Sequence, residues 1–228
     1  MFIKHGCNTI VVLLVYVDDI VLSGNDLPEI QRITNLHDNA FKIKDLEDLR
    51  YFLGFEVARS STGINLCQRK YALDILNDAG MLGSKPVSTP CDYTTKLHQH
   101  SGSPLLAEDA SSYRRLIVRL IYLINIRPNI TYIVQQLSQF VVDPTADHRQ
   151  IVFQILRYLK GTPGAGIFLS AVNPFHLKGF SDSDWVGCLD TRRSIIGYVV
   201  YLGNSLISWN LRGKLLYPEV LLKLNIGP

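Results

Sequence analysis

Val11-Val12-Leu13-Leu14-Val15-Tyr16-Val17-Asp18-Asp19-Ile20-Val21-Leu22 is the stretch that decides how this chain folds. Apart from Tyr16 and the two acids, every side chain in it is aliphatic, and many are β-branched, as strands prefer. Ser23-Gly24-Asn25-Asp26 then supplies the polar and glycine residues that end a strand. The stretch therefore predicts a β-hairpin of two deeply buried strands with Asp18 and Asp19 at its tip.

Two explanations of the acidic pair are open from these residues alone. Adjacent carboxylates on a tight turn can approach one point, where they repel each other unless a cation lies between them. Hard carboxylate oxygens suit Mg²⁺, which polymerases hold with one or two carboxylates plus substrate phosphates. The alternative is a polar turn without a metal, because Asp is a common turn residue.

The motif Tyr16-Val17-Asp18-Asp19 is similar to the YxDD motif of reverse transcriptases, and its surroundings resemble the copia-type retrotransposon version. Further matches follow in the family's order along the chain, with departures at Val118, usually a glycine, and at Asn129, frequently an aspartate. The resemblance covers roughly residues 1–214. The matching stretches are Phe41-Lys42-Ile43-Lys44-Asp45-Leu46, Tyr51-Phe52-Leu53-Gly54-Phe55-Glu56-Val57, Gln68-Arg69-Lys70-Tyr71, Tyr113-Arg114-Arg115-Leu116, Leu120-Ile121-Tyr122-Leu123, Arg127-Pro128-Asn129-Ile130, Leu156-Arg157-Tyr158-Leu159-Lys160-Gly161-Thr162, Ser181-Asp182-Ser183-Asp184-Trp185-Val186-Gly187-Cys188 and Thr191-Arg192-Arg193-Ser194.

This resemblance implies an RNA-directed DNA polymerase that works by two-metal nucleotidyl transfer. Asp18 and Asp19 would be catalytic and would hold Mg²⁺ (or Mn²⁺). The implied partners are an RNA template/DNA primer duplex, deoxynucleoside triphosphates and the remainder of the Pol polyprotein. The primer and template contacts would come from Tyr16, Leu53, Gly54, Phe55, Glu56, Lys70, Arg114 and Arg115. The alternative for Gly54 is an ordinary glycine in a strand. The alternative for Lys70, Arg114 and Arg115 is that they lie on solvated helix faces.

The last part of the chain resembles the opening sheet of a ribonuclease H domain. We expect strands over 177–182, 197–202 and 205–209, with turns at Asp190 and at Gly203-Asn204. Asp182 would be the first metal-binding carboxylate there. A structural role for Asp182 at a strand end is an equal competitor from the residues alone.

The predicted fold class is α+β: a partial reverse-transcriptase palm, a helical thumb and connection, and the first strands of a ribonuclease H-like domain. The corresponding boundaries are 1–68, 69–172 and 173–214. Within them we expect strands over 52–58 and 63–67, and helices over 29–39, 70–80, 111–126, 130–142 and 146–160, from apolar spacing and from bordering prolines and glycines.

Composition agrees with a folded protein and indicates the kind of compartment in which it functions. The chain has 228 residues, 47% hydrophobic and 19% charged, and its net charge of +3 is too small to indicate nucleic-acid binding. Cys7, Cys67, Cys91 and Cys188 lie far apart, which favours free thiols in a reducing, intracellular compartment over secretion. The apolar run over 9–17 has about half the roughly 20 residues of a membrane span, so no membrane association is expected. The compartment is otherwise unknown.

The tail over 215–228 departs from the family pattern. In copia-type enzymes a helix with the sequence Ser-Arg-Ser-Ser-Ala-Glu-Ala-Glu-Tyr-Arg-Ala follows and carries a catalytic glutamate. Codons for its Ala-Glu-Ala-Glu-Tyr-Arg-Ala, read one base later, encode Leu-Lys-Leu-Asn-Ile-Gly-Pro, which are residues 222–228. We infer a reading-frame shift and expect that the ribonuclease H part does not cleave RNA.

Two functional hypotheses from different classes follow. The family's fingers and a further metal-binding aspartate precede the hairpin, so we expect the chain to be inactive alone. The first hypothesis is a segment of an RNA-directed DNA polymerase that needs the rest of Pol. The alternative is a degenerate, non-catalytic transposon remnant with at most weak nucleic-acid binding.

Overall fold

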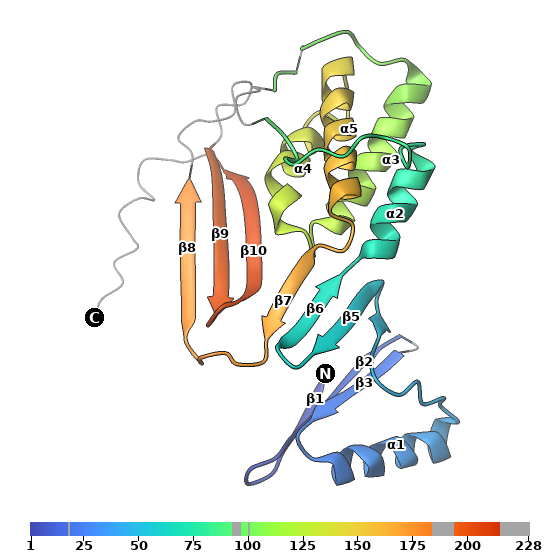
Figure 1. The fold of residues 1–228 in the computed structure, drawn as a ribbon, viewed down its shortest axis with the longest axis vertical. Coiled ribbons are helices and arrows are strands. Elements are labelled where there is room, and N and C mark those ends of the chain that lie inside the picture. Colours follow the sequence, from blue (N-terminus) through green and yellow to red (C-terminus); the bar gives the residue numbers. More distant parts are fainter. Residues whose placement is uncertain (18, 93–96, 100, 184–193, 215–228) are drawn as a thin grey trace, which may run out of the picture. The chain divides into compact units, whose positions relative to one another are not determined.

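The computed structural model divides the chain into two compact units, Met1–Val57 and Ala58–Pro228 (Figure 1). It describes all residues except 18, 93–96, 100, 184–193 and 215–228. Each unit is described here by itself. The described residues form several antiparallel sheets and five α-helices, which agrees with the mixed α and β class expected from the sequence.

The first unit is built on a three-stranded antiparallel sheet of order β1-β2-β3. Its strands are β1 (Phe2–His5), β2 (Ile10–Tyr16) and β3 (Asp19–Gly24). The predicted hairpin is confirmed, with β2 and β3 in register from Val11↔Gly24 to Tyr16↔Asp19. The edge strand β1 was not predicted, because Phe2-Ile3-Lys4-His5 is too short to show a clear alternation.

Helix α1 (Leu27–Phe41) follows the hairpin and contacts β3. It begins where the side chain of Asp26 accepts a hydrogen bond from the Glu29 backbone N–H at 3.1 Å, with Pro28 in the first turn. It ends at Lys42, which adopts a left-handed conformation with φ 54°. The predicted helix over 29–39 is confirmed and extends by two residues at each end.

The expectation that the hairpin is deeply buried is wrong. Val11 is buried, but the other described residues of β2 and β3 are half-buried or exposed. Helix α1 has no buried residue either. The physical reason is that three short strands and one helix are too few to enclose both faces of an apolar sheet.

The second unit holds most of the core, in a cluster of four helices. These are α2 (Arg69–Asp78), α3 (Ala107–Leu123), α4 (Thr131–Ser138) and α5 (Ala146–Gly161), with a 3₁₀ turn at Pro128–Ile130 before α4. Each of the four predicted helices is confirmed, with shifted ends. Apolar residues at three- and four-residue spacing point inward, as in Tyr113, Leu116, Ile117 and Leu120 of α3. Val118, which replaces the family glycine, lies on the outer face and is exposed.

Another sheet is formed by strands that come before and after these helices in the sequence. The strands β4 (Tyr51–Phe52), β5 (Phe55–Ser60) and β6 (Gly63–Cys67) precede them, and β7 (Gly166–Ser170) follows them. Their order is β4-β5-β6-β7, and the boundary between the two units falls within β5. Strand β7 was not predicted, and it pairs with β6 from Gly63↔Ser170 to Cys67↔Gly166. That pairing joins segments about a hundred residues apart, which no local pattern indicates.

The chain then forms a second three-stranded sheet of order β10-β9-β8. Its strands are β8 (Leu177–Ser183), β9 (Ser194–Leu202) and β10 (Ser205–Lys214). The three predicted strands and the turn at Gly203-Asn204 are confirmed, with Gly203 at φ 57°. The predicted turn at Asp190 and the shifted tail lie outside the described residues. That this sheet is ribonuclease H-like stays a prediction, as do the boundaries 1–68, 69–172 and 173–214.

No helix among the described residues combines the length and the apolar character that a membrane span requires.

Candidate functional site

The tip of the β2–β3 hairpin is the candidate site. Tyr16 and Asp19 are opposite each other at the ends of the two strands, so the connection is the two-residue loop Val17-Asp18. Tyr16 is 53% exposed, and Asp19 is exposed at the first position of β3. Asp18 lies outside the described residues. The convergence of the two carboxylates therefore stays a prediction.

Val17 has a backbone conformation that its side chain disfavours. Its φ is 49°, and its side chain is 81% exposed. A positive φ at the first loop residue is what the tight two-residue hairpin turns require, but a β-branched residue there is strained by about 1 to 3 kcal/mol. The pairing of Tyr16 with Asp19 thus holds Val17 in a strained backbone conformation. The sequence analysis did not predict this strain.

The donor chemistry of this tip fits a hard divalent cation. Asp19 forms no ion pair with any described residue, so no described cation neutralises its carboxylate. Two adjacent carboxylates can supply part of an oxygen shell that substrate phosphates and water complete. Within the part of the chain that the structure describes, no group of three or more His, Cys, Asp or Glu residues could hold a metal.

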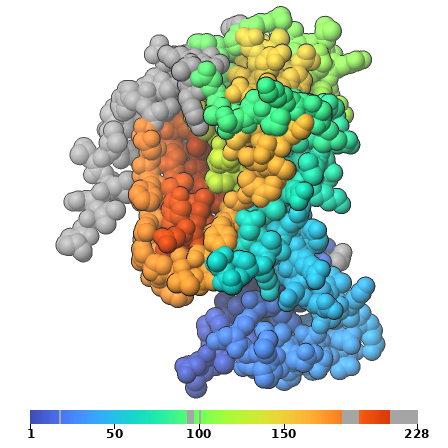
Figure 2. All heavy atoms as spheres, viewed as in Figure 1, coloured from blue at the N-terminus to red at the C-terminus, as the bar shows by residue number. Residues whose placement is uncertain are grey.

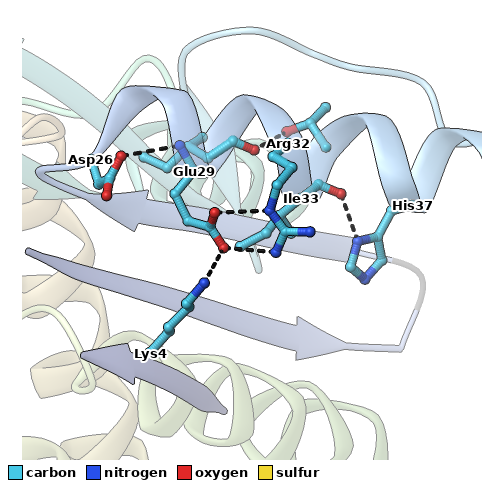
Figure 3. Close-up of polar contacts among 8 residues, drawn as sticks. Lys4, Asp26, Glu29, Arg32, Ile33 and His37 are labelled. Carbon is cyan, nitrogen blue, oxygen red and sulfur yellow. Dashed lines mark hydrogen bonds and ion pairs between the residues drawn. The ribbon is translucent and has the colours of Figure 1, made fainter. Parts of the chain in front are cut away.

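The sheet beneath the tip is tied to α1 by a charged group that the sequence analysis also missed (Figure 3). The Glu29 carboxylate accepts hydrogen bonds from Lys4 Nζ and from two nitrogens of Arg32, each at 2.8 Å. Arg32 and then Lys4 lower the pKa of Glu29 to about 2. The i,i+3 spacing of Glu29 and Arg32 was visible in the sequence, but the contact with Lys4 depends on the tertiary structure.

Two of the residues proposed to contact the primer, Leu53 and Gly54, form a turn. The predicted strand over 52–58 is therefore confirmed only in part, because the turn divides it between β4 and β5. Leu53 and Gly54 have φ of 50° and 79°, and they reverse the chain between β4 and β5, where Phe52 pairs with Phe55. Two successive positive φ values define a tight hairpin turn, which Gly54 makes accessible. Leu53, Phe55 and Glu56 are half-buried, and Gly54 is exposed.

The three cations predicted to contact phosphates lie in the second unit. Lys70 is exposed in the first turn of α2, and Arg115 is exposed on α3. Arg114 donates hydrogen bonds to the carbonyls of Val141 and Val142 at 2.7 and 2.9 Å, beyond the end of α4. A cavity of about 520 Å³ beside Arg114 is lined by none of the other predicted site residues. These contacts hold Arg114 against the segment after α4, and its contact with phosphates stays a prediction.

Comparison with known proteins decides the family. A family described as "Reverse transcriptase (RNA-dependent DNA polymerase)" matches residues 1–93. The "Retrovirus-related Pol polyprotein from transposon RE1" of Arabidopsis thaliana is 44% identical over 210 residues, which are 92% of this chain and 14% of the polyprotein. The corresponding protein from transposon TNT 1-94 of Nicotiana tabacum is 32% identical over 215 residues, 91% of this chain and 16% of the polyprotein.

Residues 1–93 belong to the reverse transcriptase family, and the chain as a whole is related to the copia-type retrotransposon Pol polyproteins. An uncharacterised mitochondrial protein of Arabidopsis thaliana is also similar, at 38% identity over 200 residues, 88% of this chain and 82% of the relative. No solved structure matches. The chain thus spans about a seventh of the RE1 polyprotein that it matches.

Asp182 lies near the end of β8. It is exposed, it is opposite Gly197 of β9, and its Oδ1 accepts a hydrogen bond from the Ser183 N–H at 2.9 Å. Its neighbour Asp184 lies outside the described residues. Among the described residues, Asp182 belongs to no group of three or more potential metal ligands, and its metal-binding role stays a prediction.

The family motif over 127–130 has a structural role in this chain. Arg127 is 2% exposed and donates to the Thr162 carbonyl and to Thr162 Oγ1, both at 2.7 Å, and to Asn129 Oδ1 at 3.3 Å. Its guanidinium lies 5.6 Å from the centre of the Tyr158 ring. Burial lowers the pKa of Arg127. The motif thus stabilises the carboxyl end of α5, where a cation is favoured.

Proposed function

We propose that this chain supplies the metal-binding hairpin of an RNA-directed DNA polymerase, with Asp18 and Asp19 as its catalytic carboxylates. The observation that carries the proposal is the two-residue loop closed by Tyr16↔Asp19 in a chain of this family. That loop leaves the Asp19 carboxylate exposed and without an ion-pair partner among the described residues.

The chemistry follows from where these oxygens are presented. Mg²⁺ or Mn²⁺, when bound, would neutralise the phosphates and favour attack by the primer hydroxyl. Asp18 and Asp19 would orient the cations, and Tyr16 would line the nucleic-acid side of the hairpin. Leu53, Gly54, Phe55 and Glu56 would position the primer, because a turn with an exposed glycine permits close approach of a nucleic-acid backbone.

The partners that this proposal requires are an RNA template/DNA primer duplex, deoxynucleoside triphosphates and the remainder of the Pol polyprotein. Lys70 and Arg115 would contact template or primer phosphates. Asp182 would belong to an associated ribonuclease H-like segment.

A chimaera tests the proposal. In it, this chain replaces the matching segment of the transposon RE1 Pol polyprotein, and primer extension on an RNA template is measured with Mg²⁺. We expect extension by the chimaera, and a loss on the order of a thousandfold for Asp18→Asn with Asp19→Asn, because metal positioning supplies several kcal/mol to such reactions. Asp38→Asn, which removes an exposed carboxylate from the same unit, is the matched control and retains activity.

Equal extension by the chimaera and the double variant would refute the catalytic assignment. A chimaera that folds but extends no primer would instead favour the degenerate remnant. Fluorescence anisotropy with an RNA/DNA hybrid then measures whether weak binding persists and whether it decreases in Lys70→Ala with Arg115→Ala.

A further inference from the structure

The segment over 97–105 is held against the start of α5 by backbone hydrogen bonds. The Leu105 N–H donates to the Pro144 carbonyl at 3.1 Å, and the Ala146 N–H donates to the Ser103 carbonyl at 2.9 Å. Figure 1 shows the green segment that leads into α3 passing beside the amino end of α5. In the space-filling view these atoms lie at the surface of the second unit (Figure 2).

His148 adds a contact to this segment from inside α5. Its side chain is fully buried, and its ring stacks on the Phe140 ring with the two centroids 4.1 Å apart. Its Nε2 lies 3.1 Å from the His98 carbonyl oxygen. Its Nδ1 lies 3.2 Å from the Thr145 backbone nitrogen and 3.1 Å from Thr145 Oγ1. His148 thus joins the amino cap of α5 to the segment over 97–105.

These contacts fix the position of the proton on the His148 ring. A backbone N–H can only donate, so the Thr145 N–H requires that Nδ1 carries no proton and accepts. A carbonyl can only accept, so Nε2 carries the proton and donates it to the His98 carbonyl. In the capping box of α5, His148 therefore acts as the Glu or Gln of the usual motif, and it does so only as a neutral ring.

Protonation is incompatible with this arrangement. A second proton on the His148 ring goes to Nδ1, where it meets the Thr145 N–H, so that two donors face each other and a hydrogen bond is lost. The ring would also carry its charge in a fully buried position, which is costly without a paired counterion. Acid therefore favours a state in which the ring is exposed.

The surrounding charges do not remove this cost. Asp109 pairs with Arg149 at 2.5 Å, and Arg114 is bonded to the carbonyls after α4. Asp143, Asp147 and Glu108 are exposed, so water screens their attraction for a protonated ring. The charged and titratable residues described on the elements around His148 are Asp143 after α4, Glu108, Asp109, Tyr113 and Arg114 of α3, Asp147 and Arg149 of α5, and His98 of the segment.

We propose that His148 is a pH-sensitive clamp, which holds the segment over 97–105 on α5 while its ring is neutral and releases the segment when the ring is protonated. Release exposes the ring, and an exposed histidine takes up a proton at about pH 6.5. Release is therefore coupled to the binding of one proton and becomes more favourable as the pH falls below that value. The same segment forms one wall of the cavity beside Arg114, so release also opens this cavity. All residues of the clamp lie in the second unit, apart from the proposed catalytic hairpin.

Hydrogen exchange of the full chain tests the clamp. A proton bound only in the released state makes release about tenfold more favourable at pH 5.5 than at pH 7.5. We expect the protection factors of the Leu105 and Ala146 amides, corrected for intrinsic exchange at each pH, to fall by that factor. His148→Gln keeps an acceptor for the Thr145 N–H but cannot be protonated, so its protection factors stay constant. His176→Gln, at an exposed position of the second unit, is the matched control and responds like the wild type.

The ring nitrogens of the wild type test the assignment directly. A long-range ¹H–¹⁵N NMR spectrum at pH 7.5 is expected to show His148 with a protonated Nε2 and an unprotonated Nδ1. The opposite tautomer, or a doubly protonated ring at that pH, overturns the proposal whether or not His148→Gln folds. Wild-type protection factors that do not change with pH also overturn it. So does a change that persists in folded His148→Gln, because another group is then responsible.

Discussion

The hairpin unit and the helical cluster differ in how they are stabilised. In Met1–Val57, Val11 is buried in the sheet, α1 has no buried residue, and Lys4 of β1 forms an ion pair with Glu29 of α1. In Ala58–Pro228, α3 and α5 alone bury eleven residues. The proposed catalytic acids thus lie in the less enclosed of the two regions, where substrates have access but the stabilisation by burial is small.

The largest effect is expected when one leucine in each region is replaced by alanine and the losses of stability are compared. Leu120→Ala removes a fully buried side chain from α3 and is expected to destabilise the second unit by about 2 to 5 kcal/mol. Leu22→Ala removes a half-buried side chain from β3 and is expected to destabilise the first unit by about 1 kcal/mol or less. Hydrogen exchange measured by mass spectrometry on peptides from each unit separates the two effects. Equal losses in both units would contradict the comparison.

A smaller effect is expected from Arg127→Met, which keeps most of the volume but removes the guanidinium. It leaves the Thr162 carbonyl without its charged donor, and we expect the second unit to lose about 2 kcal/mol of stability. Chemical denaturation followed by helical circular dichroism measures it. Arg115→Met, at an exposed position of α3, is the matched control, and a similar loss there would mean that burial of Arg127 is unimportant.

The smallest effect is the pH dependence of the Glu29 ion pairs. Arg32 and Lys4 lower the pKa of Glu29 from 4.5 to about 2, so the folded state binds this proton less tightly than the unfolded state. The contribution of Glu29 to the stability of the first unit is therefore complete above pH 4.5 and is lost as the pH falls toward 2. Because the side chains of Lys4 and Arg32 are exposed, at 62% and 57%, solvent screens these ion pairs, and the effect is small and decreases with salt.

Urea titrations that follow the NMR signals of α1 amides measure this pH dependence. The advantage of the wild type over Glu29→Gln should be present above pH 4.5 and vanish toward 2. Glu47→Gln, at an exposed position of the same unit, is the matched control. An advantage that grows as the pH falls would contradict the assignment.

Prediction from the sequence succeeded where local pattern and long-range packing agree. Helices were predicted over 70–80 and 146–160 because the apolar spacing there is regular and glycine or proline borders them, and the structure has helices over 69–78 and 146–161. It failed at Leu53-Gly54, where an apolar run hides a turn that depends on two positive φ values. It also missed β7, because no local sequence pattern indicates the pairing of β7 with β6. It overestimated the burial of the hairpin, because composition shows which residues are apolar but not whether other elements pack over them.

The sequence by itself determined the family and the position of the acidic pair, because an apolar hairpin interrupted by Tyr16-Val17-Asp18-Asp19 is a local pattern with a specific chemical use. The tertiary structure alone decided which side chains are available. It engages Arg114 with the carbonyls of Val141 and Val142, buries Arg127 at the end of α5, and leaves β8 exposed. The physical reason is that a charged side chain has the same formula in a core and on a surface, and only packing determines which of its partners are within reach.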